Sequence, residues 1–324
     1  MPEFHFHPFG EPIVTTIMDR IDEHTHVPAE QLVEAPPFPS SIKIEITSRC
    51  NFACSYCASK RRLRPQGDID KAFLQRILRE AKSVGVREIG MFLLGESLLV
   101  KELPEYVRYA KEQAGIEYVF ITTNGSLATP ERATALVDAG LDSLKFSINA
   151  GSRGRYKEMH GVDAFDKVLA NIKWLYDFRK ARNLEKPRIS VSSIGMGKGF
   201  DETDKLREMV KPFVDDFYLL PLYNQGGHVG HDGASIVGNP GRLENMVPPT
   251  PCWTIFNSSR ITWNGRLTAC SFDHDTRFEI ADLNKVSLVE AWHNPKFVEL
   301  RRQHLSGNRE VLKASLCAKC LGLK

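Results

Sequence analysis

Hydrophobic and polar residues alternate along residues 42–46, Ile-Lys-Ile-Glu-Ile, and this two-residue period predicts a β-strand. A helical period follows over residues 68–84, where apolar side chains recur every three or four positions before Gly85. The same unit then recurs: further strands are predicted at residues 88–92, 118–122, 143–148, 188–193 and 217–220, and further helices at 103–113, 130–139, 163–182 and 201–210. Six strands with intervening helices imply an α/β fold with a parallel sheet and right-handed crossovers.

The pattern changes in the C-terminal part of the chain. Residues 260–263 and 266–269 flank Asn264-Gly265, which predicts a β-hairpin, and residues 288–304 predict a short helix. A Pro-rich stretch at residues 239–251 has the composition of a linker. We therefore expect three segments: an N-terminal extension at residues 1–40, the repeating α/β unit at 41–238, and a small hairpin-plus-helix domain at 239–324.

Composition limits the classes of protein to consider. The 324 residues are 42% hydrophobic and 26% charged, as in globular proteins. A net charge of +3 does not indicate the strongly basic surface that binds nucleic acids. The sequence holds no stretch of about 20 apolar residues, so we expect no membrane partner, and the N-terminus lacks the layout of a signal peptide. A cytoplasmic location follows. There, seven cysteines favour metal or redox chemistry over disulfides.

Three of those thiols, Cys50, Cys54 and Cys57, lie within eight residues directly after the first predicted strand. Ligands bind at this edge of an α/β sheet. Structural zinc has four protein ligands, and no fourth Cys or His lies nearby in the sequence. A four-iron, four-sulfur cluster held by three thiolates instead leaves one iron open to another ligand. The Cys-x3-Cys-x2-Cys spacing, with Tyr56 before the last cysteine, resembles the radical S-adenosylmethionine superfamily.

This resemblance implies a partial (β/α)6 TIM-like barrel, a 4Fe-4S cluster on the three cysteines, and bound S-adenosylmethionine, whose 5′-deoxyadenosyl radical abstracts a hydrogen atom from a substrate carbon. Gly95 and Glu96 resemble the family motif that holds the methionine amino group, although Leu94 and Ser97 replace the family's Gly and Pro. The other expected cofactor contacts are Tyr56, Thr123, Asn124, Ser147, Asn149 and Arg155.

Four more cysteines lie in the C-terminal domain: Cys252, Cys270, Cys317 and Cys320. Their layout around the predicted hairpin resembles the twitch and SPASM domains of radical enzymes. Since four cysteines suffice for one cluster, the resemblance implies a single auxiliary 4Fe-4S cluster, the second in the protein. A structural zinc ribbon is the alternative, because four thiolates would also fit zinc.

Whether all seven cysteines bind iron distinguishes two possible reactions, an oxidation and an epimerisation. If all seven are ligands, none is left to return a hydrogen atom to the substrate, and oxidation of a secondary alcohol to a ketone is favoured, as in the aminocyclitol and sugar alcohol dehydrogenases that the layout resembles. If Cys252 is instead a hydrogen-atom donor, the enzyme is an epimerase. Tyr223 or His228 would accept the hydroxyl proton in a dehydrogenase.

Polar residues at the ends of the last two predicted strands suit a hydroxyl-rich substrate such as a sugar, aminocyclitol or glycoside; they are Ser192, Ser193, Tyr223, Asn224, Gln225 and His228. A reductant such as flavodoxin or ferredoxin would be the protein partner. We expect His5, His7, His24 and His26 on the surface. A peptide-modifying radical enzyme and a non-catalytic iron-sulfur scaffold remain as alternatives, although the short extension shows no winged-helix peptide-recognition domain.

Overall fold

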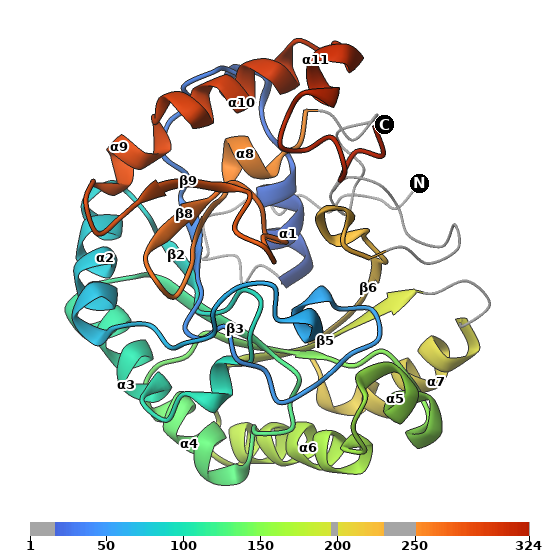
Figure 1. Ribbon diagram of the computed structural model, residues 1–324. Helices are drawn as coiled ribbons and strands as arrows, with labels where there is room; N and C mark the ends of the chain where they lie inside the picture. Colours follow the sequence, from blue (N-terminus) through green and yellow to red (C-terminus); the bar gives the residue numbers. More distant parts are fainter. Residues whose placement is uncertain (1–16, 196–199, 230–250, 324) are drawn as a thin grey trace, which may run out of the picture.

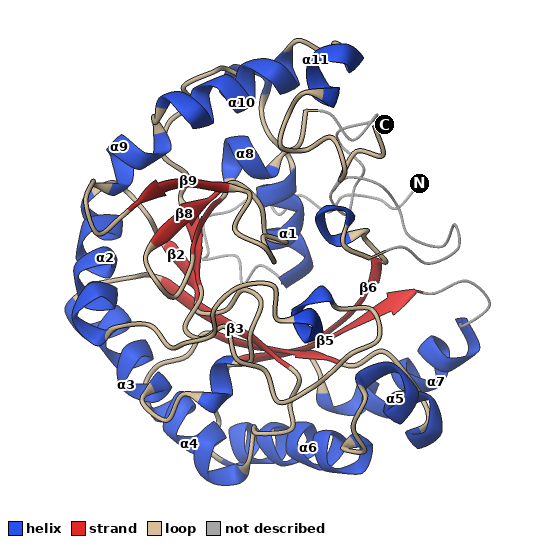
Figure 2. Ribbon diagram, in the orientation of Figure 1, coloured by secondary structure: helices blue, strands red, loops and turns tan. Residues whose placement is uncertain are grey.

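A computed structural model of the chain describes residues 17–195, 200–229 and 251–323. Its core is a parallel sheet that curves into a partial barrel (Figures 1 and 2). The six barrel strands are β1 (Ser41–Ile44), β2 (Glu88–Gly90), β3 (Tyr118–Thr123), β4 (Ser143–Ser147), β5 (Arg188–Gly195) and β6 (Asp216–Pro221). Each strand pairs in parallel with the next in sequence, so the expected α/β partial barrel is confirmed.

Helices follow the strands and cover the outer face of the sheet (Figure 2). They are α2 (Lys71–Ser83), α3 (Leu103–Arg108), α4 (Pro130–Asp138), α5 (Arg153–His160), α6 (Phe165–Ala181) and α7 (Phe200–Val210). The side chain of Asp70 caps α2 by accepting a hydrogen bond from the N–H of Phe73, and Thr129 caps α4. The helical period in the sequence predicts these helices except α5, because most of the eight residues of α5 are polar or charged and leave no apolar pattern.

Burial along β3 alternates with the two-residue period of a strand. Val119, Ile121 and Thr123 are buried towards the helices, whereas Tyr118, Phe120 and Thr122 keep some accessible surface and line a cavity. The same alternation leaves Lys43 of β1 and Lys145 of β4 facing the interior. The interior of the barrel is therefore hollow rather than filled by side chains.

The C-terminal strands continue the barrel sheet. β7 (Ser259–Ile261) pairs in parallel with β1, and β8 (Arg266–Thr268) and β9 (Glu279–Asp282) follow in antiparallel order. The predicted hairpin is confirmed, with Gly265 at φ 80° in its turn. The single helix expected at residues 288–304 is wrong: the chain forms α9 (Leu288–Trp292) and α10 (Pro295–Leu305), because Pro295 cannot continue a helix and Asn294 caps a new one. The short helices α8 (Thr254–Asn257) and α11 (Arg309–Lys313) complete the domain.

Helix α1 (Ile17–Thr25) contacts β6 and α8, on the inner side of the curved sheet (Figure 1). The expectation that His24 lies on the surface is wrong, since its ring bonds Glu88 at 2.9 Å inside the barrel, whereas His26 is exposed. His5, His7 and the expected domain boundary near residue 239 lie outside the described residues. None of the helices that the structure describes combines the length and the apolar character needed to cross a bilayer.

Candidate active site

The loop after β1 carries Cys50, Cys54 and Cys57, all as free thiols. Burial raises the pKa of Cys50 to about 11 and that of Cys54 to about 12, and the charge of Cys57 adds to both increases. Cys50 and Cys54 are therefore desolvated, and each lies close enough to Cys57 to interact with it electrostatically. Thiols without a nearby compensating positive charge gain most from binding a soft, cationic iron centre as thiolates.

The backbone of the cysteine loop packs closely against the backbone that follows β2. A Cβ atom added to Gly95 would lie 2.1 Å from the carbonyl oxygen of Thr47, so only glycine fits there. The next N–H, of Glu96, donates a hydrogen bond to the carbonyl oxygen of Arg49 at 2.8 Å. Gly95, expected to contact the cofactor, thus holds the cysteine loop directly.

Glu96 joins the ends of β2 and β3. Its carboxylate accepts hydrogen bonds from Thr123 Oγ1 at 2.8 Å, from the N–H of Asn124 at 2.7 Å and from the N–H of Leu98 at 3.1 Å. Only 2% of Glu96 is exposed; burial raises the pKa of its carboxyl, and these hydrogen bonds oppose the increase. Asn124 in turn donates to Asn51 Oδ1 at 2.9 Å, beside Cys50. The predicted Glu96, Thr123 and Asn124 therefore meet at the cysteine loop.

A second buried network surrounds the hydroxyl of Tyr56. Asn149 Nδ2 donates to that hydroxyl at 2.5 Å, and the Oδ1 atom of Asn149 accepts from the N–H of Ile194 at 2.8 Å. His160 Nδ1 lies 3.3 Å from the Tyr56 hydroxyl and 3.5 Å from Cys54 Sγ. Burial lowers the pKa of His160 to about 4, so its ring is neutral near pH 7. No pattern in the sequence indicates His160, which reaches the site from the end of α5.

Two other predicted cofactor contacts lie on β4 and α5. Ser147 ends β4 opposite Ser192 of β5, at the same edge of the sheet as Asn149. Arg155 lies on α5, where it forms an ion pair with Glu158 at 2.7 Å, one helical turn away. Its guanidinium is thus already engaged on the helix surface.

The C-terminal cysteines also interact as a group. Burial raises the pKa of Cys317, and the charges of Cys252, Cys270 and Cys320 raise it further. Cys252 precedes α8, Cys270 follows β8, and the other two lie in the turns after α11. Loops far apart in the sequence thus bring four thiols together, Cys252 among them.

A fully buried arginine lies beside this group. Arg260 NH1 donates to the carbonyl oxygens of Thr254 at 3.2 Å and Ser258 at 3.0 Å, and its Nε bonds Ser271. Burial lowers the pKa of Arg260 to about 10, while the charges of Cys270 and Cys252 act in the opposite direction. Its NH2 has no hydrogen-bond partner within the described part of the chain. A buried positive charge with a free N–H fits an anionic cluster on these thiols.

Single-ion and cluster geometries differ in how closely the ligands approach. Within residues 17–195, 200–229 and 251–323, no three His, Cys, Asp or Glu side chains gather as the ligands of one metal ion do. In a four-iron cluster each thiolate binds a different iron, so the sulfur atoms stand further apart. Within the described residues, the C-terminal cysteines therefore do not stand as the ligands of one zinc ion in a zinc ribbon do.

Residues after β6 connect the two cysteine groups. Gln225 Nε2 donates to the carbonyl oxygen of Tyr56 at 2.8 Å, and its Oε1 lies 3.1 Å from His274 Nε2. Asn224 Nδ2 donates to the carbonyl oxygen of Cys320 at 2.6 Å. Gln225 adopts φ 48°, a conformation unfavourable for a residue with a side chain. Both residues, expected to face a substrate, instead bond to the protein.

The other residues expected near the substrate divide between two places. Tyr223 lines the barrel cavity. His228 is 7% exposed and lies 3.3 Å from Asp275, and burial lowers its pKa. Ser192 and Ser193 are buried within β5. Of this group, Tyr223 alone lines the cavity.

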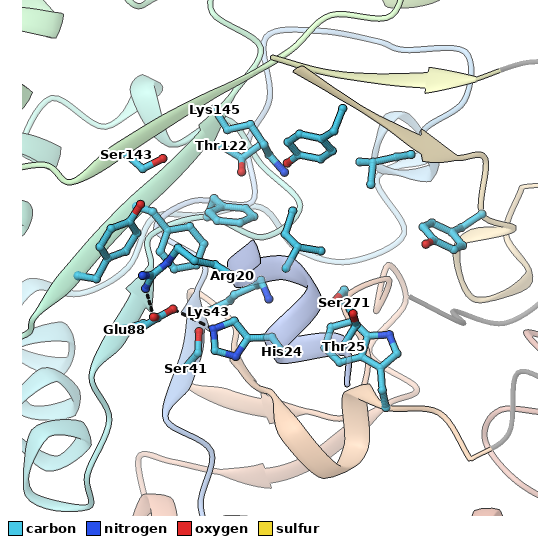
Figure 3. A pocket seen from close by; sticks show the side chains of 18 residues that line it. Arg20, His24, Thr25, Ser41, Lys43, Glu88, Thr122, Ser143, Lys145 and Ser271 are labelled. Carbon is cyan, nitrogen blue, oxygen red and sulfur yellow. Dashed lines mark hydrogen bonds and ion pairs between the residues drawn. The ribbon is translucent and has the colours of Figure 1, made fainter. Parts of the chain in front are cut away.

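The cavity inside the barrel has a volume of about 220 Å³ (Figure 3). Arg20 and His24 of α1 line the cavity and engage Glu88. The lining also includes Trp253 and Ser271, the chain neighbours of Cys252 and Cys270. Sequence reasoning missed Lys43 and Lys145 on its wall, although a lysine between apolar residues in a buried strand was a signal.

Comparisons with known proteins agree with this architecture. The family model of the radical SAM superfamily matches residues 44–211, and that of an iron-sulfur cluster-binding domain, SPASM, matches residues 252–321. A probable GTP 3′,8-cyclase of Saccharolobus solfataricus is 28% identical over 277 residues, which cover 75% of this chain and 86% of the relative.

Solved structures share the fold. A crystal structure of BtrN in complex with AdoMet and 2-DOIA has a TM-score of 0.56 at 21% identity, covering 86% of this chain and 92% of BtrN. Streptococcus suis SuiB bound to the precursor peptide SuiA has a TM-score of 0.64 at 16% identity, covering 86% of this chain and 68% of SuiB.

Proposed function

Because the chain belongs to the radical S-adenosylmethionine superfamily, we propose that it abstracts a hydrogen atom from a hydroxylated small molecule and oxidises a secondary alcohol to a ketone. As a member with an auxiliary-cluster domain, it uses S-adenosylmethionine, a 4Fe-4S cluster and an auxiliary iron-sulfur cluster. When bound, these cofactors supply the 5′-deoxyadenosyl radical that takes the hydrogen atom. The enzyme also needs a reductant, for which flavodoxin or ferredoxin would serve.

The cysteines divide between the clusters in this proposal. Cys50, Cys54 and Cys57 bind the cluster in which one iron has no cysteine ligand and is available to S-adenosylmethionine. The four C-terminal cysteines, Cys252, Cys270, Cys317 and Cys320, bind the auxiliary cluster. Their mutual electrostatic influence and their lack of disulfides support this division.

The proposed cofactor contacts lie at the carboxyl ends of the strands. A carboxylate has about four acceptor positions, and three are taken at Glu96, which leaves one for the methionine ammonium group. Thr123 and Asn124 orient that carboxylate, while Tyr56 and Ile194 hold the amide of Asn149. Ser147, and Arg155 if it leaves Glu158, complete the proposed set.

The cavity within the barrel is the observation that carries the proposed substrate class. Pockets for drug-sized ligands have volumes of about 300–1,000 Å³. A cavity of about 220 Å³ fits a smaller molecule, of the size of a monosaccharide or an aminocyclitol. Arg20 and His24 of α1 line the cavity and engage Glu88, which supports a compact substrate over a peptide that passes through the site.

Oxidation requires the carbinol to lose a hydrogen atom, a proton and an electron. The auxiliary cluster would take the electron, and Tyr223, which lines the cavity, is the proposed proton acceptor. His228 is the alternative acceptor, but it lies against Asp275 and His274. Cys252 lies among the auxiliary cysteines and does not line the cavity, which supports a ligand role over hydrogen-atom donation in an epimerase.

A second candidate comes from the relatives named GTP 3′,8-cyclase. By analogy with that name, this chain would be an enzyme that closes a ring on a nucleotide. A peptide substrate, as in the SuiB complex, is the third candidate.

Product analysis in deuterated water tests the reaction. The anaerobically reconstituted, reduced enzyme is incubated with candidate sugars and aminocyclitols. A ketone product with no solvent deuterium on carbon, formed together with 5′-deoxyadenosine, is the expected outcome. Solvent deuterium on a carbon whose configuration is inverted would contradict the proposed alcohol oxidation and identify the enzyme as an epimerase.

A further inference from the structure

We infer that the barrel cavity binds an anionic group of the substrate, a phosphate or a carboxylate, through Lys43 and Lys145. This deepens the proposed function and rests on it for the identity of the bound molecule as a substrate. The two lysines project from the inner faces of β1 and β4 (Figure 3). Nothing in the radical chemistry itself requires a cation at either position.

Neither lysine has a hydrogen-bond or ion-pair partner among residues 17–195, 200–229 and 251–323. The ammonium of Lys145 lies 5.9 Å from the ring centre of Phe92 and 5.5 Å from that of Tyr218, contacts that leave its donors free. Lys43 is enclosed by the barrel, and its accessible surface faces the cavity. Enclosed cations normally have an anionic partner, so these two lysines favour an anionic ligand in the cavity.

The one carboxylate on the cavity wall, within the described residues, is Glu88. It is already engaged by the guanidinium of Arg20 and by His24 Nε2 at 2.9 Å. Arg260 adds a further positive charge, which acts on Lys43 from β7. The wall itself therefore carries three Lys or Arg side chains, Arg20, Lys43 and Lys145, against one carboxylate.

Other lining residues offer further unused polar groups. Within the described chain, no hydrogen-bond partner is found for Thr122 Oγ1, the Tyr218 hydroxyl or the indole N–H of Trp253. Most buried polar groups in proteins are bonded, so several unbonded ones around one cavity indicate a ligand that completes them. Hydroxyls on a sugar-like body would pair with the two hydroxyl groups, while an anionic group would accept from the lysines.

Equilibrium binding tests this inference without turnover. Calorimetry on the anaerobic holoenzyme, saturated with S-adenosylmethionine so that the carboxylate of the cofactor does not compete, compares glucose 6-phosphate, glucuronate and neutral glucose. We expect one of the anionic probes to bind about 10- to 100-fold more tightly than glucose, the effect of a charged hydrogen-bonding contact. The stronger of the two anions identifies phosphate or carboxylate as the group recognised.

Variants place the effect at the cavity. Lys43→Met and Lys145→Met should each remove the preference for the anion, and Lys145→Arg should restore part of it. Lys285→Met makes the same charge change at a side chain that is 79% exposed and should leave binding unaltered. Equal affinities for all three probes, or an anion preference that survives in both Met variants, would overturn the inference. A wild-type enzyme that binds the anion but cleaves no S-adenosylmethionine would instead refute the proposed function alone.

Discussion

The Oε1 atom of Gln225 accepts a hydrogen bond from the backbone N–H of Ala58 at 3.0 Å, next to Cys57. The same side chain bonds the carbonyl oxygen of Tyr56, and His274 of the C-terminal domain lies within hydrogen-bond reach. Asn224, the preceding residue, bonds Cys320. One turn after β6 therefore ties the loop of the first cysteine group to the domain of the second.

Replacing Gln225 with alanine should loosen this connection. The N–H of Ala58 would lose its partner in a part-buried position, at a cost of about 1–3 kcal/mol in the free energy of unfolding. Urea unfolding and amide hydrogen exchange at Ala58 measure the two effects. Gln303→Ala, which removes an exposed hydrogen bond to Glu299, is the control. Unchanged exchange at Ala58 would contradict the tethering role.

Arg260 should raise the reduction potential of the auxiliary cluster. A buried positive charge beside Cys252 and Cys270 stabilises the more negative, reduced form of a bound cluster. In a redox titration followed by electron paramagnetic resonance, Arg260→Met should shift the auxiliary potential to more negative values, and Arg260→Lys should shift it less. Arg266→Met, at a partly exposed ion pair with Asp282, is the matched control. The prediction fails if Arg260→Met leaves the auxiliary potential unmoved.

Lys43 should reduce the stability of the fold. Burial, helped by the charges of Arg260 and Lys145, lowers the pKa of Lys43 from 10.5 to about 7. Between pH 7 and pH 10.5, Lys43 binds more protons in the unfolded chain than in the folded one, so its contribution to the free energy of unfolding rises with pH over this window. Below pH 7 its destabilising effect has its full value. Arg20, His24, Glu88, Tyr118 and Tyr218 also line this cavity.

Lys43→Met should therefore stabilise the ligand-free protein at pH 6 by about 1–3 kcal/mol, and the gain should shrink towards pH 10. Denaturant titrations at the two pH values measure it, with Lys285→Met as the exposed counterpart. A variant that is less stable than wild type at pH 6 would show that Lys43 supports the fold instead of a ligand.

Glu96→Gln should weaken both the site and the fold. Three donors converge on this carboxylate, so a glutamine amide would turn an N–H group towards another donor. We expect a loss of about 1–3 kcal/mol in stability and at least about tenfold weaker binding of S-adenosylmethionine by equilibrium dialysis. Glu105→Gln, at an exposed ion pair with Lys71, should change neither quantity. Wild-type affinity in the Glu96 variant would remove Glu96 from the proposed cofactor site.

The periodic parts of this fold could be predicted from the sequence because each depends on local patterning. Alternation in residues 42–46 indicated β1, and the Asn264-Gly265 turn indicated the hairpin. Two features depend on tertiary contacts between distant segments: the pairing of β7 with β1, and the entry of α1 into the barrel. Neither leaves a local signal in the sequence.

The candidate site shows the same division. Spacing alone grouped Cys50, Cys54 and Cys57, whereas the bonds of Gln225 to the cysteine loop span more than 160 positions of the chain. Because Gln225 is polar, its position after β6 indicated a contact with a ligand. Its side-chain amide is instead bonded to the backbone N–H of Ala58. The interior position of Lys145 required the register of β4 in the sheet.

Iron counting combined with cofactor cleavage tests the central claim, a radical-generating cluster on three cysteines and an auxiliary cluster on four. The anaerobically reconstituted wild-type protein should hold about eight irons and, when reduced, convert S-adenosylmethionine to 5′-deoxyadenosine. The variant with Cys50, Cys54 and Cys57 all replaced by alanine should keep about four irons and form no 5′-deoxyadenosine. A triple variant that retains all the iron, or a wild-type protein that forms no 5′-deoxyadenosine, would contradict it.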